Sequence, residues 1–348
     1  MRKQAGLSLV ELMISITLGL VLMAGVVQMF LSSKRVFITQ QGMSRIQETG
    51  RLGIEFMSRD IRAAARYGCL RSDPATNNII LQDGDLDLGG LHTDFAEGVM
   101  GYDSAEDLPN GADEDLGLAE ERIDEDESII VLRSVAEVGF PVNKTSNGTQ
   151  VFAYTNATAV VDNCVDDICK NKAVIVSDCY SSRVFQVTDL SVAANTLTIT
   201  HAPGWGGDAA KQLEIFSEGE VAPITTTVYF IAEGAGGQPS LWQRKDDEGA
   251  LELLEGVERM RITYAPRATV DNPNPTYSLA ADIDAVEWPL INSVRVELLV
   301  RSLENNVQED PQSYTFGDVL VDPAEADPDD RYLRQVFTTT IGIRSREN

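Results

Sequence analysis

The first 35 residues constrain the fold more than any other part of the chain. From Leu12 to Ser33 there are 22 consecutive residues without a charged side chain, rich in Leu, Val, Ile and Met. As a helix rising about 1.5 Å per residue, this run reaches roughly 33 Å, enough to cross a hydrocarbon core about 30 Å thick. A cleaved secretory signal has a shorter apolar run that ends at a small-x-small site, and no such site follows here. The segment therefore predicts a membrane helix.

One carboxylate, Glu11, stands at the start of this apolar run. A charged side chain at the centre of a membrane helix costs roughly 2.5–3.5 kcal/mol on insertion scales, so acids in membrane helices usually have a partner. A plain signal anchor would explain the length of the run and the basic residues Arg2 and Lys3. It would not explain Glu11.

The residues just before Glu11 offer an explanation. The sequence GLSLVE from Gly6 to Glu11 follows a short basic peptide. It resembles the class III leader of type IV pilins and pseudopilins, with Leu7 where Phe or Met is more usual. The resemblance implies that a prepilin peptidase cleaves between Gly6 and Leu7 and that the new Leu7 amine is N-methylated. It also implies a charge pair between Glu11 and the terminal amine of a neighbouring subunit, because either charge alone is costly in an apolar medium.

The helix is expected to continue beyond the membrane. Residues 32–67 contain no proline, and Gly68 is a plausible C-cap. Apolar residues recur at the spacing of one helix face at Ile54, Met57, Ile61, Ala64 and Ala65. The pattern predicts one helix of about 60 residues, apolar all round over residues 7–31 and amphipathic over residues 32–69. The amphipathic half should pack against a sheet.

The rest of the chain reads as strands. Short β-branched segments separated by turn residues begin at residue 128, and several alternate apolar with polar side chains. They are Ser128–Arg133, Ala173–Ser177, Arg183–Thr188, Asn195–Thr200, Thr225–Ala232, Ser240–Arg244, Arg261–Tyr264, Val294–Arg301 and Gln335–Arg344. Leu251–Arg259 fits either a strand or a short helix. The expected fold class is α+β, with a long N-terminal helix packed on an antiparallel β-sheet head domain over residues 128–348.

Three further segments resemble one family of pilins. They are RDIRAAARYGC ending at Cys69, VSDC followed by VFQVT, and RQVFTTTIGIR ending at Arg344. All three are similar to PilW-type minor pilins. The resemblance implies a subunit that takes part in priming type IV pilus assembly and is incorporated in the filament, at the tip. The J-type pseudopilin of type II secretion shares this architecture and is the first alternative.

The resemblance also implies a location and partners. The N-terminus would be cytoplasmic, the helix would cross the inner membrane once, and the head would lie in the periplasm before entering a filament at the cell surface. The local charge rule leaves the orientation open, because Lys34 and Arg35 flank the far end of the helix. The expected partners are the major pilin, other minor pilins and the prepilin peptidase. Adhesion, twitching motility and DNA uptake are not distinguished by these residues.

Four cysteines are compatible with disulfides in an oxidising compartment. They are Cys69, Cys164, Cys169 and Cys179. Four cysteines allow three pairings, between which the sequence does not choose. Because Cys164 and Cys169 could close a small loop and Cys69 could tie the helix to the sheet, we favour Cys164–Cys169 with Cys69–Cys179. A zinc site is the rival, although no CxxC spacing or nearby histidine completes it.

An acidic insertion is expected over residues 70–127. Residues 82–127 hold 17 Asp or Glu and one arginine. Carboxylates alternate as in a calcium loop at Asp83, Asp85, Asp87 and Asp94. However, Leu88 stands where such a loop needs glycine, and its last position is Asp rather than Glu. A solvated insertion without a ligand is the simpler reading, and a membrane-anchored, calcium-binding adhesin is the second alternative function.

Composition and motifs speak against several function classes. A formal net charge of −26 repels nucleic acid, so no nucleic-acid partner is expected. The only histidines are His92 and His201, and the chain lacks the HExxH, P-loop, GxSxG and GxGxxG motifs. We therefore expect a structural protein rather than an enzyme, with no cofactor apart from the calcium considered above.

Overall fold

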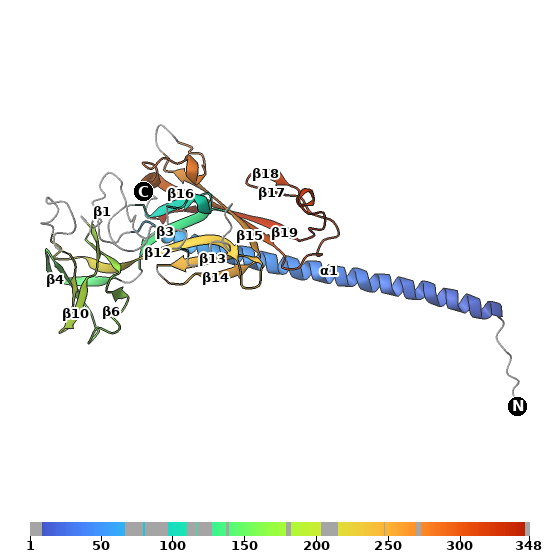
Figure 1. The fold of residues 1–348 in the computed structure, drawn as a ribbon, viewed down its shortest axis with the longest axis horizontal. Helices are drawn as coiled ribbons and strands as arrows, with labels where there is room; N and C mark the ends of the chain where they lie inside the picture. Colours follow the sequence, from blue (N-terminus) through green and yellow to red (C-terminus); the bar gives the residue numbers. More distant parts are fainter. Residues whose placement is uncertain are drawn as a thin grey trace, which may run out of the picture.

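A computed structural model shows a long helix that projects from an elongated head (Figure 1). It describes residues 9–66, 79–80, 97–109, 116, 127–136, 139–178, 182–202, 215–246, 248–268 and 273–344. The free end of the helix and the outermost strands of the head lie at opposite ends of the molecule. This arrangement confirms the expected α+β class, with one N-terminal helix and a largely antiparallel head.

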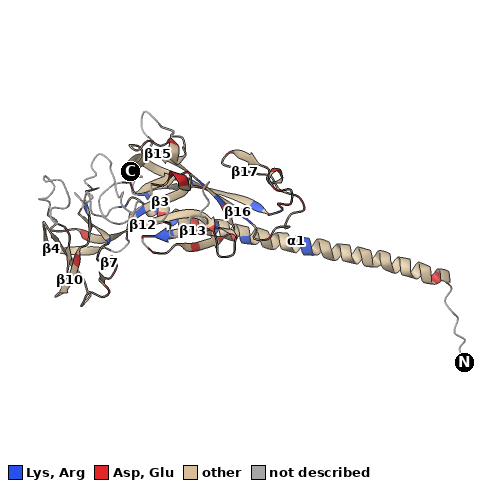
Figure 2. Ribbon diagram, viewed as in Figure 1, with Lys and Arg blue, Asp and Glu red and all other residues tan. Residues whose placement is uncertain are grey.

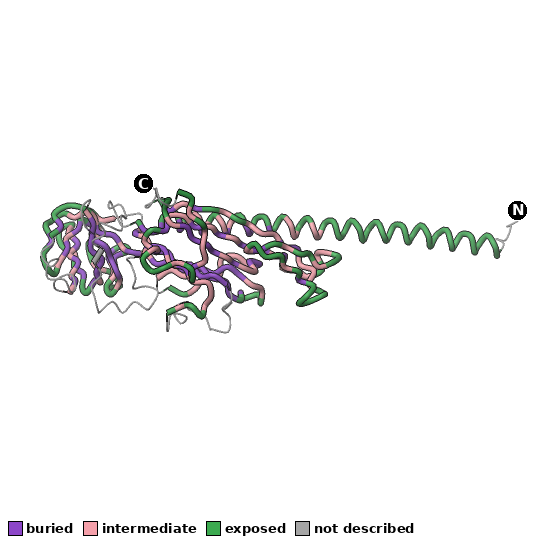
Figure 3. The backbone as a smooth tube through the Cα atoms, turned by 90° about the horizontal axis from the view of Figure 1, so that it is seen from above, coloured by how far each residue is buried: buried purple, intermediate pink, exposed green. Residues whose placement is uncertain are grey.

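Helix α1 spans Leu9–Ala63 without interruption and has two different environments. Its first half, up to Phe37, lies outside the head and is exposed on all sides (Figure 3). Its second half buries one face against the head. The buried residues are Ile46, Thr49, Gly50, Gly53, Met57 and Ile61. The change follows the sequence, because the first half is apolar all round and the second half is amphipathic.

The helix ends earlier than the sequence suggested. Gly68 was expected to cap it, but α1 ends at Ala63, and Gly68 lies outside the described residues. Ala65 adopts a left-handed conformation with φ of 57°, and its N–H donates to the carbonyl of Arg133 at 2.8 Å. Arg133 belongs to strand β3 (Ile129–Val135). The backbone after Ala63 therefore hydrogen-bonds to strand β3 instead of continuing the helix to Gly68.

Two antiparallel sheets enclose the buried half of the helix. The first has the strand order β2-β3-β12-β13-β14. Its further strands are β2 (Val99–Tyr102), β12 (Glu220–Glu233), β13 (Pro239–Lys245) and β14 (Leu251–Glu255). The second sheet consists of β15 (Val257–Pro266), β16 (Ile291–Arg301) and β19 (Arg334–Gly342). One apolar core joins α1 to both sheets.

A second lobe, which we call the distal lobe, lies at the end of the head away from the free helix (Figure 1). It contains the strands β4 (Phe140–Asn147), β5 (Gln150–Tyr154), β6 (Cys164–Val165), β7 (Ile168–Cys169), β8 (Ala173–Ser177), β9 (Ser182–Gln186), β10 (Asp189–Ala193) and β11 (Thr196–Thr200). It has its own core, with Val151, Phe185 and Leu197 fully buried. The long strand β12 connects the lobes, because its first residues pair with β8 and its later residues pair with β3.

Short elements complete the described structure. They are β1 (Ile79–Ile80), β17 (Tyr314–Phe316), β18 (Val319–Val321) and the 3-10 turns η1 (Ala105–Asp107), η5 (Ala280–Asp282), η6 (Trp288–Leu290) and η7 (Pro323–Glu325). Strand β1 pairs with β9 in parallel, which departs from the antiparallel rule of the rest. Strands β17 and β18 form a hairpin within the long connection from β16 to β19.

The strands that the sequence predicted are present, with small shifts at their ends. The ambiguous Leu251–Arg259 segment is strand on both sides of a turn at Gly256, whose φ of +89° suits a residue without a side chain. The sequence analysis did not predict β1, β2, β4, β5, β6, β7, β10, β17 and β18. Strand β4 carries mostly polar, exposed side chains, so the apolar alternation that indicates a strand is weak there.

Close contact between α1 and the sheets requires glycine at two helix positions. A Cβ at Gly50 would overlap the ring of Phe337 on β19, and one at Gly53 would come within 2.9 Å of the Leu298 side chain on β16. At Gly42, by contrast, the nearest atom would be a methyl group of Val307 at an ordinary 3.5 Å. Glycine therefore serves packing at positions 50 and 53, but not at position 42.

We predict opposite effects for two glycine-to-alanine substitutions. Gly50→Ala forces the helix away from Phe337 and should lower the free energy of unfolding by about 1–3 kcal/mol. The matched control, Gly42→Ala, should be neutral or stabilising by up to about 1 kcal/mol, because alanine favours the helix. Urea unfolding of the detergent-solubilised chain measures both. Equal unfolding free energies for the two variants would contradict the packing described here.

Candidate assembly surface

The exposed half of α1 is the largest apolar surface in the described structure. Apolar side chains from Leu9 to Phe37 are more than half exposed. It is also long and apolar enough to cross a membrane. Figure 2 shows almost no charged residues on this part of the helix. No part of the chain that the structure describes covers these side chains, and exposed apolar surface of this size is typical of segments that contact a membrane or another protein.

Glu11 lies in the first turn of α1, among exposed apolar side chains. The polar groups near it are satisfied within the helix. Ser15 Oγ donates to the carbonyl of Glu11 at 2.7 Å, and Thr17 Oγ1 donates to that of Ile14 at 2.9 Å. Such bonds let hydroxyl groups stay in an apolar medium. Gly6 and Leu7, the expected cleavage and methylation sites, lie outside the described residues.

Contacts with the head hold the helix just beyond its apolar half. Arg35 forms an ion pair with Glu309, and Thr39 Oγ1 donates to the carbonyl of Val307 at 3.3 Å. Both partners lie in the connection between β16 and β19. Further along the helix, Arg45 pairs with Glu255 at 3.3 Å. The exposed pairs add little energy, but together they fix where the helix leaves the head.

A buried polar contact ties the last turns of α1 to the first sheet. Tyr229 on β12 donates its hydroxyl to Asp60 Oδ2 at 2.7 Å, and Gln243 on β13 donates to the same oxygen at 3.1 Å. Burial raises the pKa of Tyr229 well above its ordinary value, and the Asp60 charge adds to the rise. Hydrogen bonds to a charged acceptor are stronger than neutral ones, so this contact sets the register of helix on sheet.

A cluster of charges fixes both ends of the connection from β16 to β19. The buried Arg334 donates to both oxygens of Glu258, at 2.6 and 2.8 Å, and to both oxygens of Asp330, at 2.7 and 2.8 Å. Arg301 also binds Glu258, at 3.1 Å, and its guanidinium stacks 4.3 Å from the ring centre of Tyr332. The connection that touches Arg35 and Thr39 is thus anchored to the strands at its base.

The pKa values in this cluster follow from the same contacts. Burial alone would raise the pKa of Asp330, but hydrogen bonds and charge from Arg334 outweigh it and lower that pKa. Burial alone would lower the pKa of Arg334, but its bonds to Glu258 and Asp330 raise it instead. The charged forms of both groups are therefore stabilised in the folded chain.

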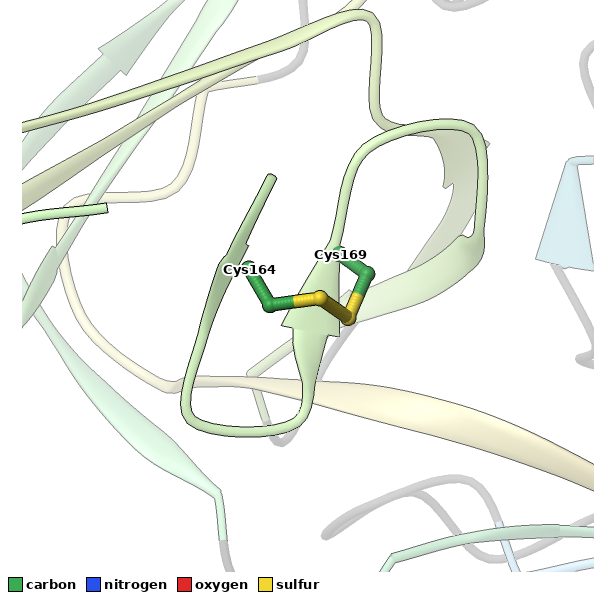
Figure 4. The surroundings of a disulfide bond; sticks show 2 residues. All are labelled: Cys164 and Cys169. Carbon is green, nitrogen blue, oxygen red and sulfur yellow. A yellow bond between two sulfur atoms is a disulfide. The ribbon is translucent and has the colours of Figure 1, made fainter. Parts of the chain in front are cut away.

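The remaining candidate residues fall into three groups. The structure confirms the Cys164–Cys169 disulfide, which joins β6 to β7 across a hairpin (Figure 4). Cys69 and Cys179 lie outside the described residues, as do Asp83, Asp85, Asp87, Asp94 and His92, so their pairing and the calcium site stay predictions. His201 is 2% exposed and lies 5.0 Å from the Phe185 ring, and burial lowers its pKa.

Sequence reasoning missed the contact of Asp60 with the first sheet and the charge cluster around Arg334. Asp60 carried a signal, since an acid beside the apolar face of a buried helix indicates a polar partner. The pairing of Arg334 with Glu258 carried none, because only the antiparallel arrangement of β15, β16 and β19 brings these two residues together. No group of three metal-binding side chains occurs within the described ranges.

We predict that Asp330→Asn destabilises the chain in a pH-dependent way. The pKa of Asp330 is lower in the folded than in the unfolded chain, so its ionised carboxylate stabilises the fold. This stabilisation is fully present above the unfolded pKa and is lost as the pH falls through the folded pKa. Near neutral pH the substitution should cost about 2 kcal/mol. Asp329→Asn, at an exposed acid that forms an ion pair with Arg331, is the control. Urea unfolding at pH 7 and pH 3 should show a difference between the two variants at pH 7 that shrinks at pH 3, and a constant difference would contradict the assignment.

Comparisons with known proteins match both ends of the chain. The family model described as "Type IV Pilus-assembly protein W" matches residues 228–345, which contain the end of β12 and all of β13–β19. The model of the prokaryotic N-terminal methylation motif matches residues 1–27. No curated protein matches the chain.

A type IV-like pilin from Thermus thermophilus is among the similar solved structures. It is 18% identical, the match covers 51% of this chain and 84% of that one, and the TM-score is 0.23. The methylation motif at the start of the apolar helix and the PilW model over the last strands both support a type IV minor pilin of the PilW type.

Proposed function

We propose that this pilin takes part in priming type IV pilus assembly and enters the filament at its tip, after residence in the inner membrane with its head in the periplasm. One observation carries the proposal. The exposed apolar half of α1, with Glu11 in its first turn, is held rigidly by a head that leaves it uncovered.

The energetics explain why the charge matters for entry into a filament. Moving an apolar helix from lipid to protein gains little hydrophobic free energy, because lipid tails are as apolar as leucine. Packing and polar pairing must therefore drive the transfer. We propose that Glu11 pairs with the N-terminal amine of a neighbouring subunit. The N-terminal amine of the present chain would form on Leu7, after cleavage between Gly6 and Leu7.

The net charge supports a role as a minor subunit. Each chain carries a formal charge of −26, so a filament built from repeated copies would repel itself. Sparse incorporation next to other pilins avoids that repulsion. The Cys164–Cys169 disulfide supports a periplasmic head, since disulfides persist in oxidising compartments.

A type II secretion pseudopilin remains the alternative of the same architecture. The PilW model over residues 228–345 favours the pilus. Pull-down of the other minor pilins of the same cell with the full-length chain would support the pilus, and pull-down of secretion components instead would overturn it.

We predict that Glu11→Gln blocks assembly without blocking processing. The variant should still begin at N-methyl-Leu7, as measured by mass spectrometry of the mature N-terminus. Its amount in sheared pili should fall about tenfold or more, because removing one partner of a buried charge pair costs roughly 3–5 kcal/mol.

The matched control is Thr17→Val, on the same exposed helix half. Its hydroxyl bonds only to the carbonyl of Ile14 in its own helix, so incorporation should not change. The proposal would be contradicted if the Glu11→Gln variant were incorporated into pili in the same amount as the wild type, or if the mature chain began at Met1.

A further inference from the structure

The distal lobe contains an open cavity that the assembly surface does not use. Its volume is about 460 Å³. It lies between the start of β4, the residues just after β5 and the turn that joins β6 to β7. Ligand-binding cavities commonly have volumes of about 300–1,000 Å³. The lobe lies at the end of the molecule away from the free end of helix α1 (Figure 1).

The hairpin at one side of the cavity is held firmly. The Cys164–Cys169 disulfide joins its two strands (Figure 4). The side chains of Val165 and Ile168 are 1% and 0% exposed and belong to the core of the lobe. These anchors fix the turn between them, so Asp166 is presented at the cavity from a rigid support.

The walls of the cavity combine two aromatic rings with one carboxylate, that of Asp166. Tyr154 is 44% exposed, and its hydroxyl donates to Asn156 Oδ1 at 2.9 Å, which fixes the side chain. Phe140 is a second, half-buried ring in the lining. Asp166 has no hydrogen-bond or ion-pair partner among the residues that the structure describes.

A second carboxylate lies at the edge. Glu220, the first residue of β12, packs against Gly139, where a Cβ would come within 2.7 Å of Glu220 Oε2. It too lacks a polar partner within the described ranges. The described lining contains neither lysine nor arginine, so its charge is negative.

We propose that this cavity binds an arginine side chain presented by a partner protein. A planar guanidinium stacks on aromatic rings and pairs with carboxylates, which are the two kinds of group found here. Anions are disfavoured by Asp166 and Glu220, and an uncharged ligand would leave both carboxylates without a partner. The net charge of −26 adds long-range attraction for a basic partner. This binding is independent of the filament contacts made by α1.

The test is calorimetric titration of the full-length chain in detergent with Nα-acetyl-arginine amide. A ligand of this size should bind with a Kd of about 1 mM. Asp166→Asn should weaken binding about three- to tenfold, and Tyr154→Leu should do the same through loss of the ring. The matched control is Asp162→Asn, an exposed acid near the hairpin that does not line the cavity.

Two further ligands sharpen the result. The citrulline analogue has the same shape without the charge and should not bind. Putrescine, a free diamine, should bind more weakly than the arginine amide. The proposal is overturned if the wild-type chain shows no saturable binding of the arginine amide, if Asp166→Asn binds as tightly as the wild type, or if putrescine binds more tightly. Asp166→Asn should still be processed and incorporated normally, so failure here leaves the assembly proposal intact.

Discussion

The rest of the structure depends on the apolar first half of α1, which the described part of the chain leaves exposed. The side chains from Leu9 to Phe37 are exposed, and water is a poor environment for them. They must lie in lipid or against other helices at every stage. The head does not meet this requirement itself, because it encloses only the second half of α1 and leaves the first half exposed.

The head holds the helix by packing first and by polar contacts second. Glycines at positions 50 and 53 let the helix approach the β16–β19 sheet closely, and Asp60 fixes its register through Tyr229 and Gln243. The cluster around Arg334 secures the connection that contacts Arg35 near the end of the apolar segment.

The sequence predicted the parts of the fold whose signals are local. Twenty-two uncharged residues and an uninterrupted amphipathic pattern are enough to place one long helix, and β-branched runs place strands such as β8 and β16. The end of the helix was misplaced because Ala65 bonds to Arg133, a residue 68 positions away in the chain. Strand β4 was missed because its exposed side chains are polar, and neighbouring strands rather than its own residues specify it.

For the site, the sequence identified Glu11 and the disulfide between Cys164 and Cys169, which are close along the chain. It could not show the division of the head into two lobes, because β12 pairs with β8 at one end and with β3 at the other. The sequence also could not predict the cavity of the distal lobe. Tyr154 and Asp166 come from a strand and a turn that are separate in the sequence, and only the folded lobe brings them to one cavity.

The central claim is that helices of other pilin subunits cover the exposed half of α1 in the filament. The most direct measurement places a photoreactive amino acid at Ile14, one turn beyond Glu11 and 53% exposed. Irradiated pili are then sheared from the cells and the adducts identified by mass spectrometry. The account predicts adducts with the N-terminal helix of another pilin subunit. Adducts with lipid alone, or none in the pilus fraction, would contradict it.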